Sequence, residues 1–519
     1  MQSIREAVAL GVTGSFVELD GEPYYKISGS DRMAPFFMTL ASNSDLWMFL
    51  TSKGGLTAGR RDADGALFPY ETVDRLHDAH THTGPVTALR IAQPEGRYGV
   101  WRPFHDDGAL PPELERNLYK NALGSKVVFE EVHHGLGLRF RYRWAAAHDL
   151  GWVRTVSLHN TGDAPRQIDV VDGLRNLLPT GVNLGLMQGA SCLVDAYKQS
   201  EILPSGLAVH SLTSRIVDRA EAAEQLRASV TWCVGLPGMT ATLDDRWIEN
   251  LKRSEPLEPV HRTNGRRGNY LVHAGLELPA RTTRTWHMSG DVGCSHAAVA
   301  NLDRLLASGG LVSDRIQSAL DDTDAGLRAL VASADGLQAT ASPVLDAHHQ
   351  ANVLFNCMRG GVFYRNHQVT RADFAAFVAS RSRGVAERSA TFLDALPSEL
   401  SVTDLRDRAM KHGDPQLWRL AHEYLPLHFG RRHGDPSRPW NRFSIRIEDG
   451  AGNPAMHYEG NWRDIFQNWE ALCLSFPEFL PSVIAKFVNA STVDGHNPYR
   501  ISSNGVDWAT ADTEDPWSY

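Results

Sequence analysis

The chain has 519 residues, more than one hydrophobic core usually supports, so we expect two or more packed units. Hydrophobic residues make up 42% and charged residues 22%, an ordinary globular composition that excludes a largely disordered chain. The net charge of −9 argues against a nucleic-acid partner, because the average field repels a phosphate backbone.

The cysteines and the N-terminal stretch bear on the cellular compartment. The five cysteines lie far apart and include no C-x-x-C pair, which is typical of free thiols in a reducing compartment. The N-terminus lacks an uninterrupted apolar segment of signal-peptide length, and no later stretch approaches the roughly 20 apolar residues of a membrane span. We therefore expect a cytoplasmic protein with no membrane partner.

The sequence of the first half of the chain predicts mainly β-strands. Residues 16–27 place Asp20-Gly21 between two apolar-rich runs, a strong hairpin signal. In 138–144, LRFRYRW, apolar side chains alternate with arginines, which predicts a half-buried strand. Further strand-like runs occupy 125–132, 151–159, 166–171, 227–234, 269–277 and 282–288. This succession predicts a large antiparallel β-sandwich rather than βαβ units.

The spacing of apolar residues changes near residue 297, where they begin to recur every three or four residues, as in a helix. Helical segments continue from Pro343 onward, among them TRADFAAFVAS, DPQLWRLAHEYLPLHF and NWRDIFQNWEALCLSF. We therefore predict a multidomain β + α protein with a β domain over 1–297, a helical linker over 298–342 and an α domain over 343–519.

Polar and aromatic residues gather at the start of the helix predicted near 462. Asn461 can cap this helix, with Asp464 three residues later, and capping alone would explain that carboxylate. Helical spacing also puts Asp464 on one face with Gln467 and Asn468, while Arg463 and Gln467 lie four residues apart. Convergent planar donors and acceptors of this kind suit the hydroxyl pairs of a sugar ring.

Aromatic side chains that could pack on the apolar face of a sugar lie close by. They are Trp462, Trp469 and Tyr458, although buried aromatics more often belong to a core. Two loop-like stretches, 438–443 and 494–501, add Trp440 and Tyr499 as candidate contacts.

Other chemistries find little support in the sequence. His80 and His82 in HTHTG would share a face on a strand, as two metal ligands do, but no third ligand follows at a suitable spacing. Phosphate-loop, dinucleotide-binding and hydrolase-elbow motifs are absent. We therefore predict neither a metal nor a cofactor.

The stretch WRDIFQN (462–468) resembles the R-D-x-x-Q-D step of the inverting cellobiose and chitobiose phosphorylase family. Four further segments also resemble that family and occur in the same order along the chain. They are 53–73, 98–104, 153–171 and 514–519. The resemblance implies an N-terminal β-supersandwich, a helical linker and an (α/α)6 six-hairpin toroid. It also implies that Arg463, Asp464 and Gln467 bind a glucosyl-like ring, whereas Asn468 replaces an aspartate of the family.

What the resemblance implies chemically is inverting cleavage of a glycosidic bond in an oligosaccharide or disaccharide, with inorganic phosphate as a co-substrate of a phosphorylase. A complete toroid needs well over 200 residues, so 343–519 offers room for its N-terminal part, and the catalytic aspartate of the family would follow EDPWSY. Glu459 and Asp494 are the substitute acids within the chain. The alternative is a non-catalytic carbohydrate-binding or scaffold protein, and a homodimer is compatible with either hypothesis.

Overall fold

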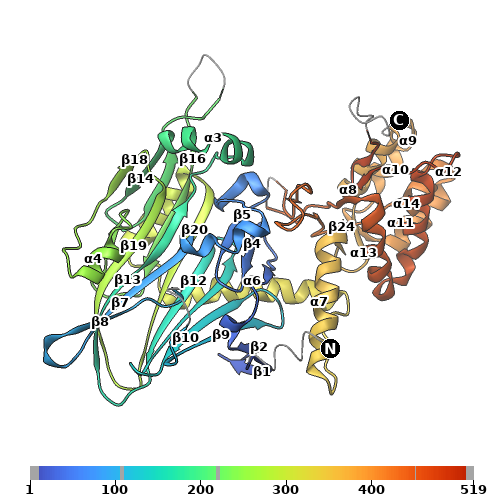
Figure 1. Ribbon diagram of the computed structural model, residues 1–519. Helices are drawn as coiled ribbons and strands as arrows, with labels where there is room; N and C mark the ends of the chain where they lie inside the picture. Colours follow the sequence, from blue (N-terminus) through green and yellow to red (C-terminus); the bar gives the residue numbers. More distant parts are fainter. Residues whose placement is uncertain (1–10, 106–109, 218–222, 450–451, 510–519) are drawn as a thin grey trace. The chain divides into compact units, whose positions relative to one another are not determined.

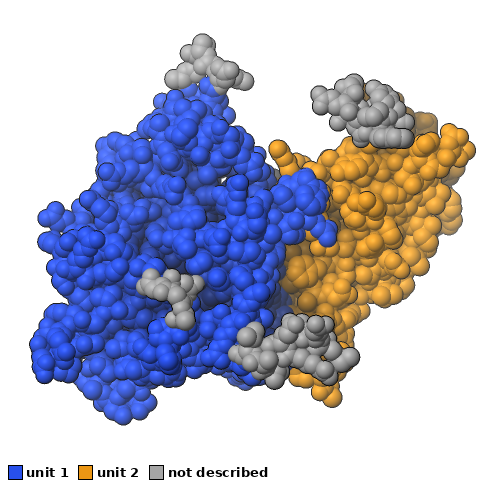
Figure 2. All heavy atoms as spheres, in the orientation of Figure 1, with its two compact units in different colours: residues 1–325, 435–440 blue, residues 326–434, 441–519 orange. Residues whose placement is uncertain are grey.

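The computed structural model describes residues 11–105, 110–217, 223–449 and 452–509. The chain forms two compact units, shown in Figure 1 and coloured separately in Figure 2. Unit 1 comprises Met1–Ala325 and Asp435–Trp440, and unit 2 comprises Gly326–Gly434 and Asn441–Tyr519. The division falls inside helix α6 (Ser313–Ser333), within the predicted linker. The stretch 514–519, which carries part of the family resemblance, lies outside the described residues.

The described residues of unit 1 form three antiparallel sheets. The largest has eleven strands, in the spatial order β1 (Thr13–Leu19), β2 (Glu22–Ser28), β9 (Leu114–Asn121), β10 (Val127–His133), β11 (Leu138–Ala147), β12 (Gly151–Asn160), β20 (Thr283–Ser295), β16 (Arg227–Val234), β15 (Ala208–Leu212), β14 (Lys198–Ile202) and β18 (Arg262–Asn264). A five-stranded sheet has the order β17 (Thr240–Thr242), β19 (Gly268–Leu278), β13 (Arg166–Leu177), β7 (Gly84–Ala92) and β8 (Tyr98–Trp101). A four-stranded sheet consists of β3 (Phe37–Leu40), β4 (Leu46–Thr51), β5 (Leu56–Arg60) and β6 (Ala66–Phe68).

The strand predictions are confirmed. Asp20 and Gly21 both have positive φ, 55° and 77°, and join β1 to β2 as the two-residue loop that a hairpin favours. Along β11 the apolar side chains are buried and the intervening arginines are partly exposed, because successive side chains point to opposite faces. His80 and His82 of HTHTG do not lie on a strand, since Ala79–Thr81 form a turn of 3-10 helix.

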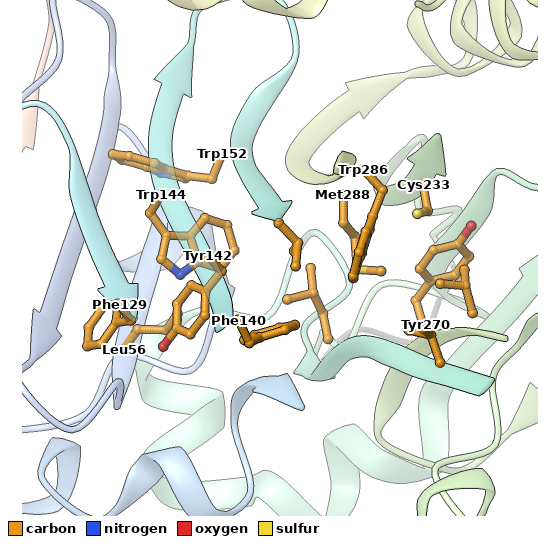
Figure 3. Packing of buried hydrophobic residues seen from close by; sticks show 14 of the residues in the cluster. Leu56, Phe129, Phe140, Tyr142, Trp144, Trp152, Cys233, Tyr270, Trp286 and Met288 are labelled. Atoms are coloured by element: carbon orange, nitrogen blue, oxygen red, sulfur yellow. The ribbon is translucent and has the colours of Figure 1, made fainter. Parts of the chain in front are cut away.

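The core of unit 1 lies between the sheets and is rich in aromatic rings, several of which are shown in Figure 3. Trp152 and Trp286 have no exposed surface. An ion pair links two sheets across this core: Arg154 on β12 donates from Nη1 to both carboxylate oxygens of Asp172 on β13, each at 2.8 Å. Both side chains are 0% exposed. Trp286 Nε1 donates to the same carboxylate at 2.7 Å, so Asp172 is extensively hydrogen-bonded.

Helices cover parts of unit 1. They are α2 (Val73–Leu76), α3 (Leu184–Tyr197), α4 (Trp247–Arg253), α5 (His296–Ala307) and the first part of α6. Ile316 and Leu320 of α6 pack on Val153 and Trp232 of the eleven-stranded sheet. The sequence did not indicate α3 or α4. Helix α3 contains two glycines and a non-helical Ala190, which weaken its periodic signal.

Unit 2 is mainly helical, as predicted. Its helices are the remainder of α6, then α7 (Pro343–Gly360), α8 (Arg371–Arg381), α9 (Arg383–Arg388), α10 (Ala390–Ala395), α11 (Val402–His412), α12 (Pro415–Glu423), α13 (Trp462–Ser475) and α14 (Leu480–Ala490). Short strands join them: β21 (Val362–Phe363), β22 (Gln368–Thr370), β23 (Glu399–Ser401), β24 (Leu427–His428), β25 (Arg431–Arg432), β26 (Ser444–Ile445), β27 (Glu459–Asn461), β28 (Arg500–Ser502) and β29 (Gly505–Asp507). The β + α composition is confirmed, while supersandwich and six-hairpin toroid stay predictions.

Helices α7 and α13 pack against each other although a hundred residues separate them. Asn468 Nδ2 donates to Asn356 Oδ1 at 2.8 Å, and Trp469 Nε1 donates to the carbonyl of Gly360 at 2.8 Å. A side chain at Gly360 would meet the Trp469 ring at 3.0 Å, so the close approach depends on this glycine. Among the described helices, none combines the length and apolar character that a bilayer span requires.

Candidate functional site

Helix α13 begins at Trp462, where the sequence places it. The cap differs in detail from the expected one. Asn461 makes no side-chain bond to the helix backbone; instead its Nδ2 donates to Asp464 Oδ2 at 3.4 Å. The side chain of Arg463 is 89% exposed and that of Asp464 is 53% exposed. Neither is among the residues that line the small cavity of unit 2 described below.

The polar residues along α13 separate into an exposed and a buried set. Arg463, Asp464 and Gln467 are exposed, whereas Asn468 is 8% exposed and its amide is engaged by Asn356. Asn468 therefore serves the contact with α7. The guanidinium, carboxylate and amide of the other three residues remain accessible to a ligand.

Two of the predicted aromatic contacts lie beside the start of α13. The amide of Trp462 donates to the carbonyl of Tyr499 at 3.0 Å. The Trp462 ring is half-buried and meets Phe487 edge to face at 4.6 Å, while Tyr499 is 49% exposed. Trp440 is also exposed but belongs to unit 1.

The two substitute acids occupy different environments. Glu459 is 9% exposed and accepts a bond from Arg500 Nη1 at 2.7 Å, with Arg432 Nε 3.7 Å away. Asp494 lies on an exposed loop. Neither carboxylate is among the residues that line the small cavity of unit 2 described next.

A small cavity in unit 2 combines a carboxyl group, hydroxyl groups, an amide and aromatic rings. It has a volume of about 80 Å³ and admits the edge of a ring rather than a whole oligosaccharide. Its polar side chains come from α8, from the end of α12 and from the segments around β27 and β28. The lining residues are Asp373, Ala376, Phe377, Ser380, Tyr424, Leu425, Met456, Tyr458, Ser503 and Asn504.

Asp373 is the carboxyl group among the described residues of this cavity. It occupies the first turn of α8, where its amide donates to the cap Thr370 Oγ1 at 3.3 Å. Its carboxylate accepts a hydrogen bond from the Tyr424 hydroxyl. Burial raises the pKa of Asp373, partly opposed by the bond from Tyr424. A carboxyl group with a raised pKa beside a polar cavity is suited to proton donation.

Lys486 lies behind the aromatic wall of this cavity. Its Nζ is 5.2 Å from the centroid of Phe377 and 5.4 Å from that of Tyr458, within cation–π range. It has no hydrogen-bond partner among the described residues and is 4% exposed. Burial and, to a smaller extent, the positive charge of Arg381 lower the pKa of Lys486 to about 7, against the opposing effect of Glu423.

We expect Lys486→Met to raise the melting temperature of unit 2 by about 3 °C or more at pH 6, because it removes a charge that burial disfavours. The folded-state pKa of about 7 lies below the ordinary 10.5, so the unfolded chain binds more protons between those pH values. Wild-type stability therefore rises across that window, and the gain of the variant shrinks towards pH 9. Calorimetry at several pH values measures this; the exposed Lys411→Met is the control. An equal gain at every pH would contradict the prediction.

The sequence pointed to Tyr458 but missed Asp373, Tyr424 and Lys486. These residues are distant along the chain, and the local helical pattern explains each of them. Asp373 lies at the start of α8, Tyr424 at the end of α12 and Lys486 within the amphipathic helix α14. The available signal was a carboxylate directly beside the buried Phe374 in TRADFAAFV. As for metals, the described residues contain no group of three or more His, Cys, Asp or Glu side chains that could hold an ion.

Comparison with known proteins gives one sequence match and several distant structural similarities. Residues 363–426 match the model of insertion domain 1 of glycoside hydrolase family 149. A search of curated proteins gave no significant match.

Three similar solved structures illustrate the structural comparison. A protein described as a kojibiose phosphorylase, from the human microbiome, has a TM-score of 0.32 and 9% identity; the match covers 75% of this chain and 48% of that one. A family GH92 α-mannosidase from Bacteroides thetaiotaomicron has a TM-score of 0.27 and 9% identity, with 67% and 40% covered. A protein described as an aldose 1-epimerase, from Klebsiella pneumoniae, has a TM-score of 0.27 and 8% identity, with 57% and 91% covered. The chain thus spans about half the length of the phosphorylase.

Proposed function

We propose that this chain is a carbohydrate-active enzyme, or a large part of one, that cleaves or phosphorolyses a glycosidic bond with inversion. The observation that carries the proposal is the match of residues 363–426 to an insertion domain of a glycoside hydrolase family. The sugar-compatible cavity of unit 2 supports it, because Asp373 and Tyr424 come from the matched segment and Tyr458 comes from outside it.

The packing of unit 2 is consistent with an inserted segment. Helices α7 and α13 form a side-by-side pair, and the chain leaves this pair after Gly360 and returns at Trp462. The helices in between, α8 to α12, have 6 to 11 residues, shorter than α7 with 18 and α13 with 14. We infer that α7 and α13 belong to the predicted toroid and that α8 to α12 form an excursion from it.

The number of carboxyl groups favours phosphorolysis over hydrolysis. An inverting hydrolase needs a second carboxylate, roughly 6.5–9.5 Å from the acid, to activate water. Asp373 is the single carboxyl among the described residues that line the cavity. Phosphate brings its own nucleophilic oxygen, so one proton donor is sufficient for its reaction. We assign Asp373 as the donor, with Glu459 and Asp494 as the acids to replace in comparison.

The exposed groups of α13 would extend the contact with the oligosaccharide. We expect Arg463→Ala to weaken sugar binding roughly 10- to 100-fold, because a guanidinium bond to paired hydroxyls is lost. The melting temperature should not change, since the side chain is 89% exposed. Calorimetric titration tests this, with Arg408→Ala on α11 as the matched exposed control. Equal affinities for wild type and Arg463→Ala would remove Arg463 from the site.

The reaction is tested by incubating the protein with cellobiose, chitobiose and α-linked glucose disaccharides, with and without inorganic phosphate. Sugar 1-phosphate that forms only in the phosphate arm supports phosphorolysis, and free sugar in both arms supports hydrolysis. Saturable binding without turnover would favour a non-catalytic carbohydrate-binding protein. That alternative has support of its own, because Arg463 and Asp464 are exposed and are not among the residues that line the cavity containing Asp373.

A further inference from the structure

Unit 1 contains a cavity of about 90 Å³, one wall of which includes Arg154 of the core ion pair. Four of its fourteen lining residues are lysine or arginine. The lining comes from the loop after β4, from the 3-10 helix η3 (Ala79–Thr81), from β7, from the segment after β8 and from the inner strands β11 to β13. The lining residues are Lys53, Gly54, His80, Thr81, Pro85, Val86, Thr87, Arg102, Pro103, Phe104, His105, Tyr142, Arg154 and Arg175. None of these described residues is acidic.

The charges in this cavity are only partly neutralised. Arg154 is paired with Asp172 in the core. Arg102 Nη1 lies 3.8 Å from Glu249, whose side chain is 48% exposed. Arg175 and Lys53 form no ion pair with a described residue. Burial lowers the pKa of Arg175; Asp245 opposes this shift, while the positive charge of Arg102 adds to it. The cavity therefore holds uncompensated positive charge.

Several buried donors of this cavity are also unsatisfied. The Nε atoms of Arg102, Arg154 and Arg175 are buried and have no hydrogen-bond partner within the described chain. A buried donor without a partner costs roughly 1–3 kcal/mol, so three such donors around one cavity indicate a missing acceptor. The guanidinium fork matches the oxygens of phosphate and carboxylate groups.

The backbone that presents these arginines is constrained. Phe104, two residues after Arg102, has a φ of 63°, and its amide is held by Glu131 Oε2 at 2.9 Å. Asn176, next to Arg175, has a φ of 59° at a register shift in the pairing of β13 with β19. Such positions cost roughly 1–3 kcal/mol and are concentrated at binding and catalytic sites, where bulges redirect side chains.

From this geometry we infer that unit 1 has a binding site for a small oxyanion, the phosphate or carboxylate group of a sugar derivative. Arg102 and Arg175 bind the anion, and Lys53 lies at the exposed rim. Phe104 and Tyr142 provide apolar surface for the carbon skeleton of a sugar. This site is distinct from the sugar site proposed in unit 2, and ligand binding here requires no turnover.

The test is calorimetric titration of the whole chain with inorganic phosphate, glucose 1-phosphate, glucuronate and neutral glucose. We expect saturable binding of at least one anion, no binding of glucose in this cavity, and weaker binding at high salt. The two phosphate arms and the glucuronate arm identify which oxyanion is preferred. Equal binding of glucose and glucose 1-phosphate, or no binding of any anion, would overturn the assignment.

Variants locate the binding. Arg175→Gln and Lys53→Gln should each weaken anion binding about tenfold or more, whereas Arg97→Gln, whose side chain is 71% exposed elsewhere in unit 1, should not. Lys53 is exposed and can be replaced without loss of folding, so the test holds if Arg175→Gln is unstable. The site would be contradicted if folded Lys53→Gln and Arg102→Gln both bound the anion with wild-type affinity. It would also be contradicted if Arg97→Gln lost as much affinity for the anion as the cavity variants.

Discussion

Asp172→Asn is expected to destabilise unit 1 by about 3–5 kcal/mol. The substitution leaves the Arg154 guanidinium without its counter-charge where both side chains are 0% exposed. It also weakens the acceptor for Trp286 Nε1 and the Thr87 hydroxyl, which donate to the carboxylate at 2.7 and 2.6 Å. Chemical denaturation followed by tryptophan fluorescence measures the change, because Trp144, Trp152 and Trp286 lie in the same core.

Two further variants separate the ion pair from general disturbance of the fold. The double variant Arg154→Met with Asp172→Leu should recover most of the lost stability, because removing both charges removes the uncompensated one. Asp163→Asn breaks an ion pair whose side chains are 63% and 88% exposed, and it should leave the unfolding free energy unchanged. If Asp172→Asn were as stable as wild type, the ion pair between Arg154 and Asp172 would not contribute to the stability of the fold.

Asp373→Asn is expected to lower the rate of glycosidic cleavage by roughly 10²–10⁴-fold, because it removes the proposed proton donor while keeping its shape. Stability should not fall at neutral pH. Burial raises the pKa of Asp373 in the folded state, so its contribution to stability is fully present below the unfolded pKa and is lost as pH rises through the folded value. At neutral pH the buried carboxylate is therefore a cost that asparagine removes.

Asp404→Asn is a closely matched control for Asp373→Asn. Asp404 occupies the same position of α11, three residues after the cap Ser401, as Asp373 does after Thr370 in α8. Its side chain is 44% exposed and is not among those that line the cavity containing Asp373. Initial rates of the two variants on the best donor decide the assignment. Full activity in Asp373→Asn, or an equal loss in Asp404→Asn, would show that Asp373 is not the acid.

The sequence was informative wherever a local pattern dominates. Alternation in 138–144 predicted β11, Asp20-Gly21 predicted the first hairpin, and apolar spacing predicted α5 to α8 and α11 to α14, but not the short helices α9 and α10. Helices α3 and α4 were missed because they interrupt a strand-rich region and have weak periodicity. The small strands of unit 2, two or three residues each, are too short to leave a pattern.

The candidate sites were harder to predict because their residues meet only through tertiary packing. The sequence suggested Arg463, Asp464 and Gln467 as a group, and the structure leaves all three exposed at the start of α13. It gave no reason to associate Asp373 with Tyr424, or Arg102 with Arg175, since a cavity joins each pair across distant segments. Asn468 was predicted to contact the sugar, but its amide donates to Asn356 of α7. The sequence gave no sign that α7 packs against α13 at this position.

The proposed reaction is tested most directly by a proton NMR time course of the best disaccharide donor in phosphate buffer. We predict a new anomeric signal from a glycosyl phosphate whose configuration is opposite to that of the donor linkage, absent when phosphate is omitted. An unchanged spectrum, or a product that retains the donor configuration, would contradict the proposed inverting enzyme.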